Sequence, residues 1–166
     1  MRRHDAAPGA IAGRRLDIGL VRLPVMDSAP VAIDVIETDE LVAVLPASDV
    51  LARRKTLDLG ALADRSFIIY SPVSVLHATI RLACHRAGFT PRVAQEAVQV
   101  QTILSLVEAG LGVALIPGRS ARFAGEGVRI VSLAEAVPIA MGIARAEEAS
   151  VLARNFVRTA LDTGKS

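Results

Sequence analysis

Residues 106 to 117 read Leu-Val-Glu-Ala-Gly-Leu-Gly-Val-Ala-Leu-Ile-Pro, and this stretch decides the fold. It begins inside a segment with helical periodicity, which predicts a helix from about Val100 to Ala109. Gly110 and Gly112 then allow the chain to reverse, because glycine adopts backbone conformations that other residues avoid. The apolar run that follows predicts a buried strand, which ends at Pro117 because proline has no N–H to give to a sheet.

The same alternation of helical and strand patterns extends outward along the chain, and it is typical of an α/β protein. We predict strands over Leu16–Arg22, Ala32–Glu37, Leu41–Pro46, Ser66–Tyr70, Arg92–Glu96, Gly112–Ile116, Arg129–Ser132 and Ile139–Arg145. We predict further helices from Ser74 to Gly88 and from Glu147 to Leu161, and one helical turn over Leu57–Ala63.

Two of these helices have a clear apolar face. In the helix after Ser74, that face is Leu76, Ile80, Ala83, Cys84 and Ala87. The last helix presents Ala149, Leu152, Ala153, Phe156 and Ala160 on one stripe. His77, Arg81 and His85 lie on the other face of the first helix, where we expect a solvated surface, because a metal site needs ligands that converge at closer spacing.

Composition excludes several classes of protein. No apolar run approaches the roughly 18 residues of a membrane span, and the first residues lack the apolar core of a secretory signal. We therefore expect a cytoplasmic chain with no membrane partner. Cys84 is the single cysteine, so an intrachain disulfide cannot form.

Charge and motifs exclude two more classes. The net charge is only +2, the basic residues are scattered, and aromatic residues make up 3% of the chain, which argues against direct nucleic-acid binding. The sequence contains no nucleophile elbow, phosphate-binding loop, zinc-protease motif or dinucleotide fingerprint. We expect no enzyme activity, no cofactor and no metal.

Five segments, in this order, resemble the effector-binding domain of LysR-type transcriptional regulators. They are Gly13-Arg-Arg-Leu-Asp-Ile-Gly-Leu-Val-Arg22, Asp39-Glu-Leu-Val-Ala-Val-Leu-Pro46, Leu57-Asp-Leu-Gly-Ala-Leu62, Ala87-Gly-Phe-Thr-Pro91 and the stretch that ends at Pro117. The resemblance covers about residues 10 to 162 and implies a two-lobed α/β fold of the type 2 periplasmic-binding-protein kind. An effector would bind in the cleft between the lobes.

The resemblance also implies a domain organisation. Lobe I would comprise residues 1–37 and 142–166, and lobe II residues 38–141, with crossing strands near Ile36–Glu40 and Met141–Ala144. Family members carry a winged helix-turn-helix, a linker helix and the first elements of lobe I before the Gly-Arg-Arg segment. We expect lobe I of this chain to be incomplete at its N-terminus, and DNA binding to need the absent winged helix-turn-helix.

Two groups of candidate effector-binding residues lie near predicted strand ends. Arg22 would follow a buried strand, and its planar guanidinium suits a carboxylate, although a surface ion pair would also explain it. Ser71, Val73, Ser74 and Val75 join a strand to a helix, where hydroxyls and free amides can hold an anion and valines can form an apolar wall. Ser74 also fits a simple helix cap.

A third group lies at the next strand-to-helix junction and after the following strand. Gln101 and Thr102, with Gln99 before them, open a helix that faces the predicted cleft, although capping or solvent exposure explains them slightly better. Pro117 and Gly118 would line the pocket by their shape.

The sequence thus predicts the effector-binding domain of a LysR-type regulator, without its DNA-binding head, that senses a small carboxylate and pairs as a homodimer. Three alternatives remain open. A transport solute-binding protein of the same fold would need a signal peptide, an enzyme would need a catalytic group in the cleft, and an interaction fragment would pair with full-length regulators through exposed edges.

Overall fold

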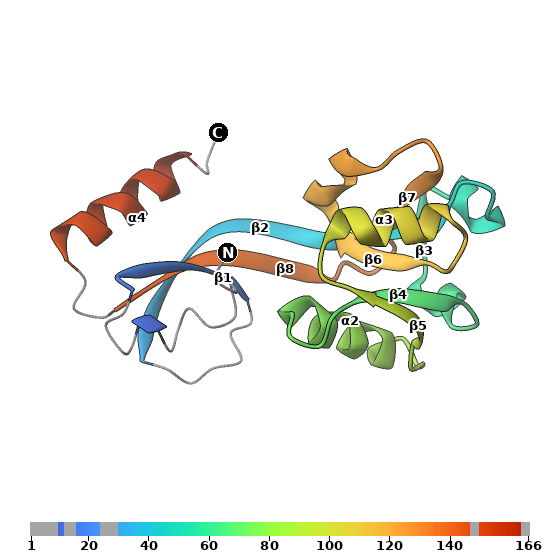
Figure 1. Ribbon diagram of the computed structural model, residues 1–166, viewed down its shortest axis with the longest axis horizontal. Coiled ribbons are helices and arrows are strands. Elements are labelled where there is room, and N and C mark those ends of the chain that lie inside the picture. Colours follow the sequence, from blue (N-terminus) through green and yellow to red (C-terminus); the bar gives the residue numbers. More distant parts are fainter. Residues whose placement is uncertain (1–9, 12–15, 24–29, 147–149, 164–166) are drawn as a thin grey trace. The chain divides into compact units, whose positions relative to one another are not determined.

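The computed structural model describes residues 10–11, 16–23, 30–146 and 150–163 (Figure 1). Its contacts divide the chain into two compact units, unit 1 with residues 1–38 and 139–166, and unit 2 with residues 39–138. The strands are β1 (Ile18–Leu23), β2 (Val31–Pro46), β3 (Thr56–Leu57), β4 (Ser66–Tyr70), β5 (Arg92–Ala97), β6 (Ala114–Pro117), β7 (Val128–Leu133) and β8 (Pro138–Ala146). The helices are α2 (Val75–Arg86), α3 (Val100–Glu108) and α4 (Val151–Thr163), with 3₁₀ turns η2 (Val50–Arg53), η3 (Leu59–Leu62) and η4 (Gly118–Phe123).

Unit 1 is built on β1, β8 and the first part of β2. β1 and β8 pair antiparallel, and β8 lies between β1 and β2 in the sheet. An apolar cluster of Ile11, Val21 and Ala144 is buried in this unit. Arg145 of β8 donates to Asp34 of β2 at 2.9 Å, so an ion pair between neighbouring strands supports the sheet.

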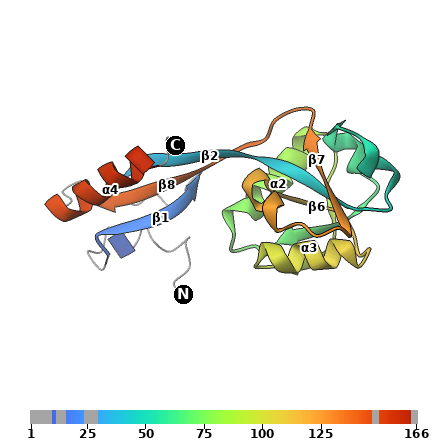
Figure 2. The same ribbon diagram turned by 90° about the horizontal axis from the view of Figure 1, so that it is seen from above.

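Unit 2 combines antiparallel and parallel pairing. The second part of β2 pairs antiparallel with β6 and β7, and β3 pairs parallel with β7. β4 pairs parallel with β5 and meets the chain just before β6 at a parallel bridge between Phe67 and Val113. In both views, α2 and α3 lie on opposite sides of these strands (Figures 1 and 2). The core includes Leu41–Leu45, Phe67–Tyr70, Ile80, Ile103, Val107 and Val113–Ile116.

The structure confirms all of the predicted strands except for one division. The strands expected over Ala32–Glu37 and Leu41–Pro46 are a single strand, β2. The intervening residues 38 to 40 are Thr-Asp-Glu, which contain no glycine or proline to break an extended backbone. β2 neighbours β8 before this segment and pairs with β6 and β7 after it, so the extended backbone continues through residues 38 to 40.

The turn predicted around the two glycines has two different causes. Gly110 adopts φ +77°, the left-handed conformation expected after a helix. Gly112 is needed for close approach instead, because a Cβ there would lie 2.5 Å from the carbonyl oxygen of Ser66. The start of β6 can approach β4 only because this residue has no side chain.

The prediction for the last helix was partly wrong. α4 begins at Val151, and the predicted residues 147–149 lie outside the described part of the chain. Ala153 and Val157 are buried, but Leu152 is 81% exposed and Phe156 54% exposed. Ala153 belonged to the predicted stripe, but Val157 did not. The buried face of α4 is therefore the one that carries Ala153 and Val157, four residues apart, and not the one with Leu152 and Phe156.

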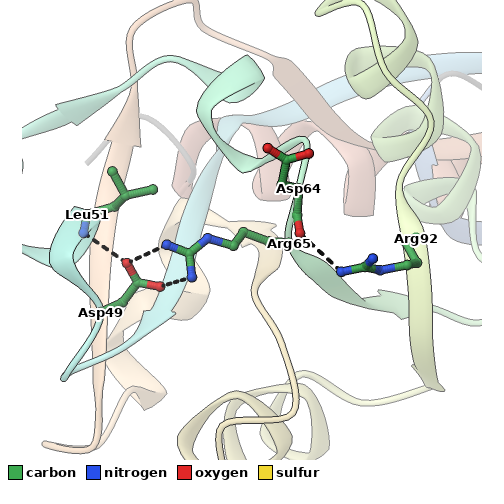
Figure 3. A network of polar contacts seen from close by, with 5 residues as sticks. All are labelled: Asp49, Leu51, Asp64, Arg65 and Arg92. Atoms are coloured by element: carbon green, nitrogen blue, oxygen red, sulfur yellow. Dashed lines mark hydrogen bonds and ion pairs between the residues drawn. The ribbon is translucent and has the colours of Figure 1, made fainter.

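A polar network supports the amino ends of β4 and β5 (Figure 3). Asp49 caps η2 by accepting from the Leu51 amide at 2.9 Å, and its carboxylate also contacts the Arg65 guanidinium at 3.0 and 3.2 Å. Arg92, the first residue of β5, donates to the Asp64 carbonyl at 3.1 Å. The Asp49 side chain is 6% exposed and that of Arg65 40% exposed, so the ion pair lies at the protein surface with its acid covered.

We predict that Asp49→Ala lowers the free energy of unfolding by about 1 to 2 kcal/mol, because it removes both the cap and the ion pair. Asp49→Asn keeps an oxygen for the Leu51 amide and should cost less than about 1 kcal/mol. Asp58→Ala is the matched control, since Asp58 caps η3 through the Gly60 amide at 2.8 Å. Urea unfolding measures all three, and equal losses for Asp49→Ala and Asp49→Asn would show that the cap contributes nothing.

Cys84 is fully buried in α2, and burial raises the pKa of its thiol from the ordinary 9.0 to about 11. The native thiol holds its proton more tightly than the unfolded thiol. Its contribution to stability is therefore complete below pH 9 and is lost as the pH rises towards 11. We predict that the difference in unfolding free energy between the wild type and Cys84→Ala shrinks over this interval. Urea unfolding from neutral pH upward tests it, and a constant difference would contradict it.

Candidate functional site

Three strands of unit 2 end at the same edge. β4 and β5 are parallel, so both carboxyl ends lie together. β6 runs in the same direction as β4, since the Val113 amide donates to the Ser66 carbonyl and the Ile68 amide to the Val113 carbonyl, both at 2.8 Å. The segments that follow these ends, residues 71–75, 98–102 and 117–119, form what we call the carboxyl edge.

The two helices at this edge leave it in opposite directions. α2 follows β4 and α3 follows the neighbouring β5, and they cover opposite sides of the strands (Figures 1 and 2). α2 packs on β4, whereas α3 packs on β4, β5 and β6. Neighbouring parallel strands whose helices diverge create a switch point, which is where open α/β sheets bind ligands. Both helix N-termini also carry a partial positive charge at this edge.

The segment between β4 and α2 holds four of the predicted site residues. The Ser71 amide donates to the Ala97 carbonyl at 3.0 Å and thereby joins this segment to the end of β5. Ser74 caps α2, because its hydroxyl accepts from the Leu76 amide at 3.2 Å. Val73 is 56% exposed, and Val75, Ser71 and Ser74 are half-buried. The cap expected for Ser74 is confirmed, and a second hydrogen bond from its hydroxyl to a ligand is chemically compatible with it.

The segment between β5 and α3 lies next to it. Gln99 occupies the position before α3, yet its side chain makes no capping hydrogen bond. Gln101 and Thr102 are exposed in the first turn of α3. Val98, which we did not single out from the sequence, is 76% exposed. Exposed apolar and polar side chains therefore lie side by side at these two junctions.

The third segment follows β6. Pro117 is buried and pairs with Leu41 of β2, so it shapes the edge without presenting a polar group. Asp39 accepts from the Glu40 amide at 2.8 Å and from the Arg119 amide at 3.1 Å. The role of Asp39 in fixing this segment was missed, because residues 39 and 119 are far apart in the sequence.

Arg22 is placed differently from the prediction. It lies inside β1, paired with Met141, rather than after the strand, and it belongs to unit 1. The strand extends one residue further because β8 offers partners as far as Ala140. Arg22 is half-buried. The carboxyl edge of unit 2 thus gathers seven of the eight predicted residues, and Arg22 belongs to the other unit.

His77 lies on the predicted solvated face with the exposed Arg81 and His85, but it also makes a specific contact that the sequence did not predict. It is half-buried, and its Nδ1 lies 2.7 Å from the carbonyl oxygen of Tyr70, the last residue of β4. Side chains in a helix lean towards its N-terminus, so a residue in the first turn reaches back to the strand before it. The position of His77, three residues after the cap Ser74, could have predicted this contact from the sequence.

Two further properties concern the whole described part of the chain. Within it, no three His, Cys, Asp or Glu side chains come together in a group that could hold a metal ion. None of its helices is both long enough and apolar enough to cross a membrane.

Comparison with known proteins identifies the relatives of this chain. Residues 3–165 match the family model of the LysR substrate binding domain. The HTH-type transcriptional regulator IlvR of Caulobacter vibrioides is 32% identical over 164 residues, which are 96% of this chain and 54% of that protein. The malonate utilization transcriptional regulator of Klebsiella pneumoniae is 34% identical over 97 residues, 58% of this chain and 32% of that protein. The chain thus spans about half the length of IlvR.

Solved structures share the fold. The regulatory domain of Synechocystis PCC6803 CcmR, in complex with 2-PG, superposes with a TM-score of 0.86 at 18% identity and covers 99% of this chain and 81% of its own. The effector binding domain of QuiR with shikimate gives 0.82 at 20% identity, covering 95% and 76%. That of BenM with benzoate gives 0.80 at 21% identity, covering 93% and 72%.

These likenesses confirm the α/β fold of the type 2 periplasmic-binding-protein kind that the sequence predicted. The match to the family model extends over nearly all of the chain. The chain therefore belongs to the LysR substrate-binding domain family and is an effector-binding domain of the LysR type.

Proposed function

We propose that this domain senses a small organic acid, and that the acid binds at the carboxyl edge of unit 2. The observation that carries the proposal is the convergence of two helix N-termini, those of α2 and α3, at the ends of neighbouring parallel strands. The partial positive charge and free amides of these ends favour an anion.

The side chains at this edge suit a carboxylate with an apolar body. Ser71, Ser74 and Thr102 offer hydroxyls, and Gln101 offers amide donors. Val73 and Val98 supply exposed apolar surface beside them. Binding sites commonly combine an apolar lining with a few polar groups that fix the orientation of the ligand.

Arg22 and the lobe organisation stay proposals. We propose that Arg22 of unit 1 contributes a guanidinium to effector binding, and that units 1 and 2 act as lobes I and II. In a full-length regulator, the effector would shift DNA binding only through a difference in its affinity for two arrangements of the protein. Related solute-binding proteins share the fold, but the curated relatives of this chain are transcriptional regulators by name, which favours the regulatory function.

We further propose that the partner is a second copy of the chain and that the domain works in the cytoplasm. The exposed Leu152 and Phe156 on α4 support pairing, because large apolar side chains four residues apart on a helix face are stabilised when they are covered. DNA binding would belong to a winged helix-turn-helix elsewhere in the regulator.

We predict that a carboxylic acid from a panel of benzoate, muconate, shikimate and glutamate raises the melting temperature of the chain. At about 100 times its dissociation constant, the stabilisation should be roughly 2.7 kcal/mol. Thr102→Glu should abolish this shift without destabilising the free domain, because a carboxylate in the first turn of α3 favours the helix but repels an anion. Arg22→Ala should weaken it.

Ser132→Glu is the control for this experiment, since Ser132 is an exposed residue of β7. It should leave the shift unchanged. If the folded chain responds to none of these acids, or if Thr102→Glu still shows the full response, the proposed site is wrong.

Substitutions at Ser74 separate its two roles. We predict that Ser74→Ala costs about 1 kcal/mol of stability because α2 loses its cap, whereas Ser74→Asp keeps the cap and the stability. Ser74→Asp should nevertheless lose the response to acids, because its negative charge lies where the anion would bind. Chemical unfolding and thermal shift measure the two effects, and an acid response retained by Ser74→Asp would exclude Ser74 from the site.

A further inference from the structure

His77 is the titratable side chain in the first turn of α2, and its contact with β4 is specific. Its Nδ1 lies 2.7 Å from the Tyr70 carbonyl oxygen, and its own amide donates to the Ser74 carbonyl at 3.0 Å. The ring therefore sits between the start of α2 and the end of β4, beside the segment of residues 71–75 at the carboxyl edge.

The contact fixes the tautomer of the neutral ring. A carbonyl oxygen can only accept a hydrogen bond, so Nδ1 must carry the proton and donate it. The other ring nitrogen, Nε2, is then unprotonated and presents a lone pair. Neutral His77 thus offers at Nε2 a group that only accepts a hydrogen bond, whereas the backbone amides at the helix N-termini only donate.

Nε2 has no hydrogen-bond partner in the described part of the chain. Among the described residues, every buried side-chain nitrogen or oxygen has a hydrogen-bond partner. The structure gives His77 one side-chain partner, the Tyr70 carbonyl, which Nδ1 occupies. Since Nε2 has no partner in this part of the chain, it is not one of the fully buried atoms.

We propose that His77 determines effector specificity by accepting a hydrogen bond, at Nε2, from a hydroxyl group of the effector. This inference rests on the proposed function and narrows its substrate class to hydroxylated carboxylic acids. The carboxylate would lie at the helix N-termini, away from the Nε2 lone pair, which repels carboxylate oxygens. A hydroxyl group is the complementary partner, because it donates one proton to that lone pair.

The test compares acids that differ only by a hydroxyl group. Calorimetric titration of the 166-residue chain with benzoate and with 2-, 3- and 4-hydroxybenzoate measures how much a hydroxyl adds to affinity. We expect at least one isomer to bind about 3- to 10-fold more tightly than benzoate, the gain of one hydrogen bond. The isomers whose hydroxyl group does not reach Nε2 should bind no more tightly than benzoate.

His77→Asn is the informative variant, because the asparagine amide can still donate to the Tyr70 carbonyl but has no group at the position of Nε2. It should keep the affinity for benzoate within about 2-fold and lose the preference for the hydroxylated isomer. His85→Asn is the control, since His85 is exposed in the last turn of the same helix. It should leave the preference unchanged.

Each remaining outcome decides between the two proposals. If the wild type binds none of the four acids and responds to no acid of the thermal-shift panel, the proposed function and this inference both fail. If it responds only to a panel acid other than benzoate, the inference alone fails. If it binds benzoate but prefers no hydroxylated isomer, or if His77→Asn keeps the preference, only the inference is overturned. A loss of affinity for benzoate and the hydroxybenzoates alike in His77→Asn overturns it too, because His77 would then hold the carboxylate or the segment around it.

Discussion

Unit 2 depends on one constraint, the parallel alignment of β4 with β5 on one side and with the residues just before β6 on the other. Phe67 to Tyr70 are buried, so β4 has strands and helices on its sides and no face left for solvent. The segment before β6 can lie this close to β4 only because residue 112 is glycine, since any side chain there would meet the Ser66 carbonyl oxygen. A residue without a side chain thus permits the close contact between the segment before β6 and the start of β4.

The candidate site follows from that alignment. Parallel strands must be joined by crossover helices, and right-handed crossovers from neighbouring strands towards opposite sides place α2 and α3 on opposite faces. Their N-termini then meet at one edge, where the Ser71 amide ties the two junctions together. Positive partial charge, hydroxyls and exposed valines gather there without any of these groups being adjacent in the chain.

The structural and the candidate functional polar groups lie at opposite ends of the same strands. The Asp49 to Arg65 ion pair and the Arg92 hydrogen bond occupy the amino ends of β4 and β5. These groups satisfy one another, as polar groups with a structural role do. At the carboxyl edge, the side chains of Gln101 and Thr102 are exposed instead, and the Nε2 atom of the nearby His77 has no partner in the described part of the chain. Polar groups that are open to solvent, next to apolar ones, are suited to binding a ligand.

By itself, the sequence determined the features that depend on neighbouring residues. It predicted the helix ends at Gly88 and Gly110, the cap at Ser74 and the strand Ser66–Tyr70, because capping, periodicity and backbone freedom act over a few residues. Only the tertiary structure decided that β2 is continuous, that Leu152 and Phe156 are exposed, that Arg22 lies within a strand and that His77 reaches Tyr70. Each of these depends on a partner element that the local pattern does not contain, since burial and pairing are set by what packs against a residue.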